Sequence, residues 1–416
     1  MKSLILIFLS ICYNADNNLK YVLDYFENGM PSDDPESYYD IDTTIFYHPN
    51  LDSSLYWVIP DGIFSEDIEV LNSNNNVAIE FFDERIFIAF RSSSSHFAGS
   101  STKMIVLSSK DGSSWDKEII INQDIDIREP LFVKINNKLM FYYFKAGTSS
   151  IKFEPSFTFM IERTSLGKWK EEKQVSKVRG RVFWSIKNRY NKIYATSYEG
   201  DHYKIFGESN LKATLLESLD GIHFNEISNS PQYTGGVSEV AFEFDENKNF
   251  WGVSRNEDGD ETGFGSHIIF ADNESIDKWK IYNTSKKIYM SPKMLRHGNE
   301  LYLIARRNKG VVPFGFMPKI FPKFMQRCFN WLKFTTSPKT TSLYRINKKY
   351  KKMEYLFDFP GSGDTAFPSI RRLDANTFLV ANYTSDIKKK NRWWFFGQIK
   401  PTYIYISKLS FEPVSN

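Results

Sequence analysis

The chain repeats one short pattern about six times, and this repeat constrains the fold more than any other feature. Each copy has an apolar strand, a polar turn rich in Asn, Asp or Gly, and a second apolar strand that ends in a charged or aromatic residue. Most copies lie ~50–60 residues apart, a spacing typical of propeller blades built from short strands. The second strands read IFIAFRSS (86–93), LMFYYFKAG (139–147), IYATSYEG (193–200), FWGVSRNE (250–257), LYLIARRN (301–308) and FLVANYTS (378–385).

This repeat predicts an all-β chain folded as a six-bladed β-propeller, with a five-bladed propeller as the alternative. Equivalent strand ends converge around one axis in such a fold, so residues far apart in the sequence become neighbours. We therefore expect the functional site in a ring of strand-end residues: Arg91, Lys145, Tyr198, Arg255, Arg306 and Tyr383.

The composition agrees with one large β core. The 416 residues include 36 Phe and 23 Tyr, which favour stacked sheets. The net charge of +3 is small and no long segment of one sign is present, so we expect no nucleic-acid partner. Two cysteines are too few for a disulfide framework. We expect the protein to be a monomer.

The chain divides into three parts. Residues 1–15 contain one lysine, a short apolar run and then polar sequence, which predicts a signal peptide or a lipoprotein signal with a lipid on Cys12. A buried first strand is the alternative. We therefore expect an exported protein, either secreted or anchored at the cell envelope. Residues 16–70 form a polar N-terminal lead-in that could supply a closing strand, and residues 71–412 form a single propeller.

One insertion, residues 311–340, interrupts the fifth blade. It is basic and aromatic, and we expect a helix from about Pro322 to Phe334. Long excursions from a compact blade are usually functional or serve as docking elements. Three interpretations stay open: a lid over the propeller funnel, a membrane-surface patch, or a packing flap.

Two turns share the pattern Ser-x-Asp-Gly-x-x-aromatic, at Ser109–Trp115 and Ser218–Phe224. The aspartate can accept amide hydrogens across the turn, the glycine adopts the left-handed conformation, and the aromatic ring fills the blade interior. We assign Asp111 and Asp220 a structural role. Such repeated turns resemble the Asp boxes of sialidases (neuraminidases), although each is one residue shorter.

A second stretch, residues 238–256, resembles the sialidase segment in which an acidic residue opens a strand and an arginine closes the next one. The resemblance implies that Glu239 partners a tyrosine nucleophile and that Arg255 belongs to a triad that binds the carboxylate of a sugar. It also implies an arginine near the first blade, where Val58 stands, and a tyrosine in the sixth blade, where Phe367 stands. Valine cannot bind a carboxylate, and phenylalanine has no attacking oxygen. Tyr383 or Tyr198 could replace the nucleophile.

The second blade opens with Arg128-Glu129-Pro130, which resembles the Arg-Asp-Pro phrase of five-bladed furanosidase-type glycosidases. Two carboxyl groups that face one cavity are the minimum for glycoside hydrolysis. The candidate catalytic residues are Glu239, Glu129, Asp364 and Tyr383, and the candidate substrate-binding residues are Arg91, Arg128, Arg255, Asn256, Arg306 and Tyr198. The alternative for each arginine and acid is a salt bridge between blades.

The sequence contains no phosphate loop or nucleotide fingerprint, and its histidines lack zinc spacing, so we expect neither cofactor nor metal. Three functions remain: a sialidase-like glycoside hydrolase that acts on an acidic glycan, a non-catalytic propeller that binds a glycan or a protein, and an interaction scaffold that uses the insertion. The expected partner is a glycan or acidic sugar, with a protein as the alternative for the second function. A lipid on Cys12 would add attachment to a membrane surface.

Overall fold

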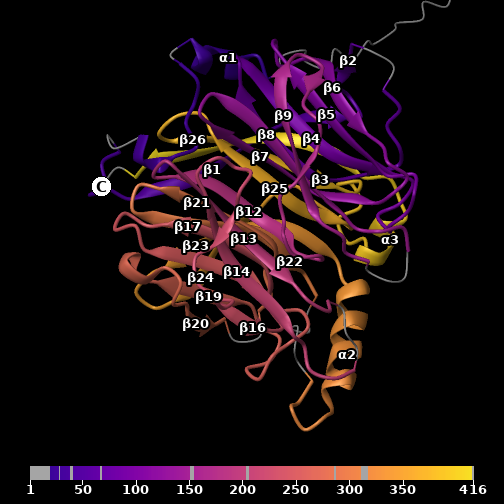
Figure 1. Cartoon of the computed structure of the whole chain (residues 1–416), viewed down its shortest axis with the longest axis vertical. Coiled ribbons are helices and arrows are strands. Elements are labelled where there is room, and N and C mark those ends of the chain that lie inside the picture. The colour runs from indigo at the N-terminus through magenta and orange to yellow at the C-terminus, as the bar shows by residue number, and fades with distance from the viewer. Residues whose placement is uncertain are drawn as a thin grey trace, which may run out of the picture.

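A computed structural model describes residues 19–27, 29–37, 41–65, 68–149, 154–202, 206–284, 287–310 and 317–414. The predicted signal segment, including Cys12, lies outside these ranges. The described residues form six sheets around one axis (Figure 1), and all strand pairs but one are antiparallel. The six-bladed prediction is confirmed, and the five-bladed alternative is wrong.

The first three blades follow one another directly along the chain. Blade one contains β3 (Ser73–Phe82), β4 (Arg85–Ser93), β5 (Lys103–Ser109) and β6 (Ser114–Ile121), with β2 (Ile63–Phe64) parallel to β6. Blade two contains β7 (Ile127–Ile135), β8 (Lys138–Lys145), β9 (Thr158–Ser165) and β10 (Lys168–Trp169), with β11 (Lys173–Gln174) also paired to β9. Blade three contains β12 (Val182–Arg189), β13 (Lys192–Glu199), β14 (Leu211–Ser218) and β15 (Asn225–Glu226), with β16 (Tyr233–Gly235) also paired to β14.

The last three blades have four strands each. Blade four contains β17 (Ser238–Phe244), β18 (Phe250–Arg255), β19 (His267–Ala271) and β20 (Lys280–Asn283). Blade five contains β21 (Met290–His297), β22 (Glu300–Asn308), β23 (Lys339–Asn347) and β24 (Lys352–Asp358). Blade six contains β25 (Thr365–Arg372), β26 (Thr377–Thr384), β27 (Tyr403–Pro413) and, outermost, β1 (Tyr47–Ile59).

The N-terminal strand β1 closes the ring, because it pairs with the C-terminal strand β27. This pairing removes an open sheet edge and joins the two ends of the propeller. Val58 therefore lies on the outermost strand of blade six, away from the axis. The alignment of Val58 with a site arginine of sialidases is wrong, and the axial strand of blade one is β3.

The predicted turns have the conformations that their residues favour. Both central residues of three hairpins, Asp83–Glu84, Asn136–Asn137 and Tyr190–Asn191, have φ between 48° and 59°, as tight hairpins with right-handed twist require. In the two Asp turns, Asp111 accepts amide hydrogens from Ser113 and Ser114 at 2.8 and 2.7 Å, and Asp220 accepts two at 2.8 Å. Trp115 and Phe224, which end these turns, are buried in the blades.

Three helices accompany the blades: α1 (Tyr21–Phe26), α2 (Lys323–Thr335) and α3 (Trp394–Gln398). The helix expected in the insertion is α2, which lies between β22 and β23, while α3 lies between β26 and β27. Phe334 of α2 packs against Trp394 of α3 with ring centroids 4.8 Å apart. No helix in the part of the chain that the structure describes is long and apolar enough to cross a membrane.

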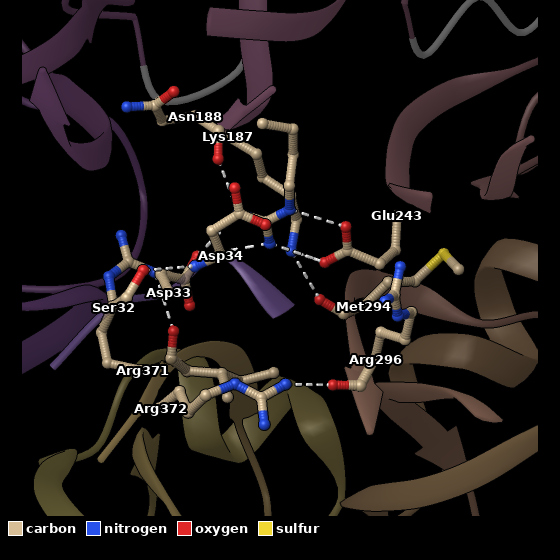
Figure 2. A network of polar contacts seen from close by, with 12 residues as sticks. Ser32, Asp33, Asp34, Lys187, Asn188, Glu243, Met294, Arg296, Arg371 and Arg372 are labelled. Atoms are coloured by element: carbon tan, nitrogen blue, oxygen red, sulfur yellow. Dashed lines mark hydrogen bonds and ion pairs between the residues drawn. The ribbon is translucent and has the colours of Figure 1, made fainter. Parts of the chain in front are cut away.

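Charged residues fill one end of the propeller axis. The first strand of each blade lies nearest the axis and ends there. Glu243 on β17 receives hydrogen bonds from Arg189 at 2.9 and 2.8 Å and from Lys187 at 2.8 Å, both on β12. Asp33, from the N-terminal lead-in, lies 3.5 Å from Arg189. Figure 2 shows Asp33 and Asp34 lying among Lys187, Glu243 and Arg371. We call Asp33, Lys187, Arg189, Glu243 and Arg371 the far-end network.

Replacing Glu243 by alanine should strongly destabilise the propeller, because two buried cations would lose their carboxylate. The expected loss is about 3–5 kcal/mol in the free energy of unfolding. Glu246→Ala is the matched control, since Glu246 pairs with Lys348 on the surface, and it should cost less than about 1 kcal/mol. Urea unfolding measures both variants, and equal losses would contradict the prediction.

The Glu243 carboxylate makes the stability of the fold depend on pH in a predictable direction. Burial alone would raise the pKa of Glu243, but Arg189 and Lys187 outweigh it and hold the pKa below its ordinary value. The ionised carboxylate therefore stabilises the fold above its unfolded pKa of about 4.3, and this contribution is lost as the pH falls below that value. The Glu243→Ala variant should lose less stability than the parent protein between neutral and acid pH.

Candidate functional site

The six innermost strands β3, β7, β12, β17, β21 and β25 surround the axis and contact one another in turn. Their first residues meet at one end of the axis, which we call the mouth, and their last residues meet at the far-end network. On β17, for example, Glu239 lies near the mouth and Glu243 lies at the far end. The propeller therefore separates two sets of charged residues that share the same strands.

Each innermost strand has a register irregularity near its mouth end. A β-bulge of this kind inserts a residue and redirects its side chain. The residues at these positions are Asn76, Glu129, Trp184, Glu239, Ser291 and Phe367, and all except Trp184 have φ between 49° and 52°. Left-handed backbone in non-glycine residues is costly and clusters at functional sites. The repeated bulge thus defines a ring of six side chains at the axis.

Two members of this ring, Glu129 and Glu239, form an axial carboxyl pair in unlike environments. Glu239 is buried, receives a 2.9 Å hydrogen bond from the Ser291 amide, and pairs with Arg255. Burial and the nearby charge of Glu239 raise the pKa of Glu129 to about 7. Glu129 also keeps some solvent exposure. The ring therefore combines a carboxylate that is paired with an arginine and a carboxyl group that is half protonated near neutral pH.

A lysine lies beside this carboxyl pair. Burial lowers the pKa of Lys293 to about 8, although Glu129 and Glu239 oppose the shift. Its ammonium donates to the Trp184 carbonyl at 2.9 Å and lies 4.7 Å from the centre of the Trp184 ring. The Trp184 indole in turn donates to the Pro292 carbonyl at 3.1 Å. Strands from blades two to five therefore fix the groups around the pair.

A second polar cluster, the mouth network, consists of His96, Arg306, Asp364, Tyr383 and Trp394. Asp364 accepts hydrogen bonds from the Tyr383 hydroxyl at 2.9 Å and the Trp394 indole at 3.1 Å. Its other oxygen lies 2.7 Å from His96 Nδ1. Arg306 donates to the Tyr383 oxygen at 3.0 Å and the Thr365 carbonyl at 2.7 Å.

Burial sets the protonation states in the mouth network. Burial would raise the pKa of Asp364, but His96 and Arg306 outweigh it and hold the pKa below its ordinary value. Burial lowers the pKa of His96, although Asp364 opposes the shift. Burial and Asp364 raise the pKa of Tyr383 well above its usual range. Asp364 is therefore ionised at neutral pH, while Tyr383 keeps its hydroxyl proton and donates it to Asp364.

Arg91 and Arg128 converge on Asp126, a residue just before β7. Arg91 donates to Asp126 at 2.8 Å, and Arg128 pairs with the other carboxylate oxygen. Arg128 also donates to the His96 carbonyl at 3.3 Å, which joins this group to the mouth network. The side chain of Arg128 is 23% exposed, whereas those of Arg91 and Asp126 are fully buried.

Phe367 joins the axial carboxyl pair to the mouth network. Its ring centre lies 5.6 Å from that of Trp184, 6.2 Å from that of Tyr383 and 5.7 Å from the guanidinium carbon of Arg306. Phe367 thus occupies an axial position, at the point where the sialidase resemblance implies a tyrosine. Its side chain offers an aromatic surface to a ligand and no nucleophilic oxygen.

The structure brings most of the predicted site residues together. Arg255 joins the axial carboxyl pair of Glu129 and Glu239. The mouth network contains three more of the predicted residues, Asp364, Tyr383 and Arg306, and Arg91 and Arg128 lie beside it on Asp126. The arginines of these groups already pair with carboxylates: Arg91 with Asp126, Arg255 with Glu239 and Glu257, and Arg306 with Asp364. The charge of the ring is therefore largely neutralised within the protein.

Three other predicted residues have different surroundings. Asn256 is buried and donates to the carbonyls of Gly263 and Gly265 at 3.1 and 3.0 Å, so it organises the loop after β18. Tyr198 packs in an apolar cluster with Trp184, against which Phe367 also lies. Lys145 pairs with Glu172 at 2.7 Å and lies over the Phe159 ring, within blade two and away from the axial pair.

Sequence reasoning assigned no site role to Lys293, Asp126, Trp184, Trp394 or His96. One signal was present, because Pro130, Pro292 and Pro368 each follow a bulge residue on an innermost strand. Proline inside a sheet is confined to edges and bulges, so these prolines mark the axial positions. Trp394 and His96 lie outside the repeat, and only the tertiary fold places them at the mouth.

Two aspartates that follow Arg255 in the sequence each pair with a histidine. Asp258 lies 3.2 Å from His202 Nδ1, and Asp260 lies 2.7 Å from His267 Nε2. Within the described ranges, no group of three or more His, Cys, Asp or Glu residues is arranged to hold a metal ion. These two acids therefore order the loop between β18 and β19.

The six blades with a bulged axial ring define a sialidase-like β-propeller, and solved structures of low identity share this fold. A protein of unknown function from Dyadobacter fermentans matches with 12% identity and a TM-score of 0.57 over 85% of this chain and 100% of that one. The Trypanosoma rangeli sialidase in complex with sialic acid matches with 10% identity and a TM-score of 0.57 over 86% of this chain and 58% of that one. The Hadza microbial sialidase Hz136 matches with 8% identity and a TM-score of 0.51 over 82% of this chain and 66% of that one.

At these identities the similarity establishes the fold alone. The chain spans less than two thirds of the length of the two sialidases. No protein-family model matches the sequence, and no curated protein sequence matches it at a significant level.

The mouth network predicts a measurable effect on His96. In Asp364→Asn the imidazole loses the negative charge that raises its pKa, so the pKa of His96 should fall further. An NMR titration of the His96 ring measures the change. Asp358→Asn is the control, because Asp358 pairs with Arg307 on the outer part of blade five. An unchanged His96 pKa in Asp364→Asn would contradict the contact.

Proposed function

We propose that this protein is a glycoside hydrolase that acts on an acidic glycan at the mouth of its propeller axis. The observation that carries the proposal is the axial carboxyl pair, Glu129 and Glu239, on bulges of two innermost strands. Glycoside hydrolysis needs one carboxyl group that supplies a proton and one that is ionised. The unlike environments of Glu129 and Glu239 fit these two roles.

Glu129 is the proposed general acid. Its pKa of about 7 keeps a large fraction of the group protonated at neutral pH. It would reach a glycosidic oxygen above the ring once the segments that cover the mouth have moved. The hydrogen bond from Asn76 stabilises the ionised form that is left after proton transfer. Lys293 would serve the same purpose by its charge.

Glu239 is the proposed base or nucleophile. Arg255 and the Ser291 amide hold its two oxygens in place, which fixes the orientation of the carboxylate. Because Phe367 provides no oxygen, the tyrosine nucleophile of sialidases has no counterpart at that position. The Glu239 carboxylate is therefore proposed to act directly on the substrate or on a water molecule, and not to activate a tyrosine hydroxyl.

An acidic sugar is the proposed substrate class. The T. rangeli sialidase structures contain sialic acid or the inhibitor DANA. In this chain, the side chain of Arg128 is 23% exposed near His96 and could bind a carboxylate that approaches the mouth. The faces of Trp184 and Phe367 could stack on a sugar ring beside it.

Access to the pair requires movement of the covering segments. Trp394 of α3 and Phe334 of α2 lie against Asp364 and Arg306, and the His96 amide bonds to the Gln398 carbonyl of α3. The cavity on the axis, lined in part by Pro130, Ser185 and Lys293, measures about 50 Å³, which suits a water molecule better than a sugar. Substrate entry is therefore proposed to displace α3 and the loop that contains His96.

The direct test is release of reducing sugar and of sialic acid from a glycan panel. Glu129→Gln and Glu239→Gln should each lower kcat by about 100-fold or more, since each removes one half of the acid–base pair. Glu80→Gln is the matched control: Glu80 is also buried on an innermost strand, but it pairs with Arg371 at the far end. Full activity in Glu239→Gln would refute the proposed mechanism.

The activity should also depend on pH with a predicted sign. Because Glu129 must be protonated to act as the acid, kcat/KM should fall as the pH rises through about 7. The Glu129→Gln variant should lose this alkaline decline. A parent protein whose activity keeps rising through pH 8 would contradict the role of Glu129.

A second function, glycan binding without turnover, is favoured by the side chain of Phe367 and by the paired arginines. A glycan array separates the two functions, since a binding protein would retain an acidic glycan and release no sugar from it. For a binding protein, Arg128→Ala should weaken retention by about tenfold or more, because it removes a partly exposed arginine side chain at the mouth.

A further inference from the structure

Helix α2 turns its polar side chains toward the protein and its apolar side chains toward the solvent, the reverse of an ordinary surface helix. Such a helix normally turns its apolar face toward the protein. In α2 the polar residues face inward, and Arg327 donates to the carbonyls of Asp258 and Gly207 at 2.8 and 2.7 Å. Gln326, Arg327 and Asn330 are buried, whereas Phe324, Met325, Trp331 and Leu332 are 40%, 37%, 63% and 53% exposed.

The adjoining segment around α3 has the same character. Trp393, Phe395, Phe396 and Ile399 are each between 45% and 48% exposed, while Gly397 and Gln398 face inward. The two helices are in contact, and Figure 1 places them on the same side of the propeller. We call the exposed side chains of 317–333 and 388–400 the basic aromatic surface. It holds nearly half of the exposed large hydrophobic side chains of the described residues.

This surface is also strongly cationic. The sequence contains no acidic residue between Glu300 and Glu354, and none between Asp386 and Glu412. Lys323 pairs with Glu208 at 2.5 Å at one end of the surface. At the other end, one open hollow is lined by Lys388, Lys389, Lys390, Arg392 and Lys400 together with Phe396. A hollow with this lining matches the phosphate of a lipid headgroup.

We propose that the basic aromatic surface docks on a lipid bilayer that carries anionic headgroups. Tryptophan and phenylalanine side chains favour the depth of the headgroups, and neighbouring lysines attract anionic lipid. Two observations coincide here: an outward apolar helix face and a cluster of cations on two stretches of sequence that contain no acidic residue. Exposed apolar side chains concentrated in this way mark an interaction site.

A second copy of the chain fits this surface poorly. A symmetric dimer would place the same face of both copies in contact, so their lysines would repel one another. A bilayer supplies the opposite charge over the whole surface. The exposed side chains of α2 and α3 can also enter a fluid interface without a complementary protein surface.

Docking in this way would bring the lipid over the mouth network. The inward sides of α2 and α3 carry Phe334, 6.0 Å from Arg306, and Trp394, which donates to Asp364. The outward sides of the same helices form the basic aromatic surface. The two helices therefore lie between the bilayer and the propeller axis. This inference rests on exposure and charge and is independent of the catalytic proposal.

Vesicle co-sedimentation of the full chain tests the proposal. All proteins carry Cys12→Ser, so that no lipid attached at that residue contributes. The protein should sediment with vesicles of phosphatidylglycerol mixed with phosphatidylcholine, and less with phosphatidylcholine alone. Raising the salt from about 0.1 M to about 1 M should weaken binding, because it shortens the Debye length from about 10 Å to about 3 Å.

Two variants separate the apolar and the electrostatic contributions to vesicle binding. Trp331→Ser with Leu332→Ser should weaken binding at least about tenfold by removing inserted apolar surface. Changing Lys388, Lys389 and Lys390 to Glu should weaken it at least about tenfold by removing charge attraction. Leu219→Ser is the matched control, because Leu219 is 69% exposed on an Asp turn of blade three.

Three results would overturn the proposal. The first is no sedimentation with the anionic vesicles. The second is equal sedimentation of the parent protein and both surface variants. The third is a dimer in analytical ultracentrifugation that Trp331→Ser with Leu332→Ser converts to a monomer, because a second copy would then be the partner of this surface.

Discussion

The bulge at the mouth end of each innermost strand is the constraint on which the site depends. A regular strand alternates its side chains between the two faces of a blade, whereas the inserted residue turns its side chain toward the axis. Five blades hold this residue in left-handed backbone, which only a firm surrounding fold can maintain. Glu129, Glu239, Trp184 and Phe367 become neighbours for this reason.

Charge pairing then determines what the ring can do. Buried arginines are stable only when a carboxylate and further hydrogen bonds compensate for their lost hydration. Arg91, Arg255 and Arg306 meet this requirement with partners from the chain itself. Within the bulged ring, burial raises the pKa of Glu129 to about 7 and lowers that of the neighbouring Lys293 to about 8, and the proposed chemistry follows from this pair. The far-end network uses the same kind of pairing to close the opposite end of the axis.

Helices α2 and α3 link the axis to the outside. Their inward side chains, Phe334 and Trp394, cover Arg306 and Asp364, while their outward side chains form the basic aromatic surface. Access to the carboxyl pair and contact with a bilayer would therefore involve the same two short elements. Insertions between strands can carry such roles, because the blades on either side keep their own hydrogen bonds intact.

Much of the fold was predictable, since alternation of apolar residues and Asn- or Gly-rich turns are local properties that repeat with each blade. The sequence by itself determined the number of blades, the role of the Asp turns and the candidacy of Glu129, Glu239 and Asp364. Only the tertiary structure placed Val58 on an outer strand, gave Arg255 and Arg306 their carboxylate partners, and brought Lys293, His96 and Trp394 to the mouth. The physical reason is that pairing and burial depend on contacts between blades, which no local pattern of residues records.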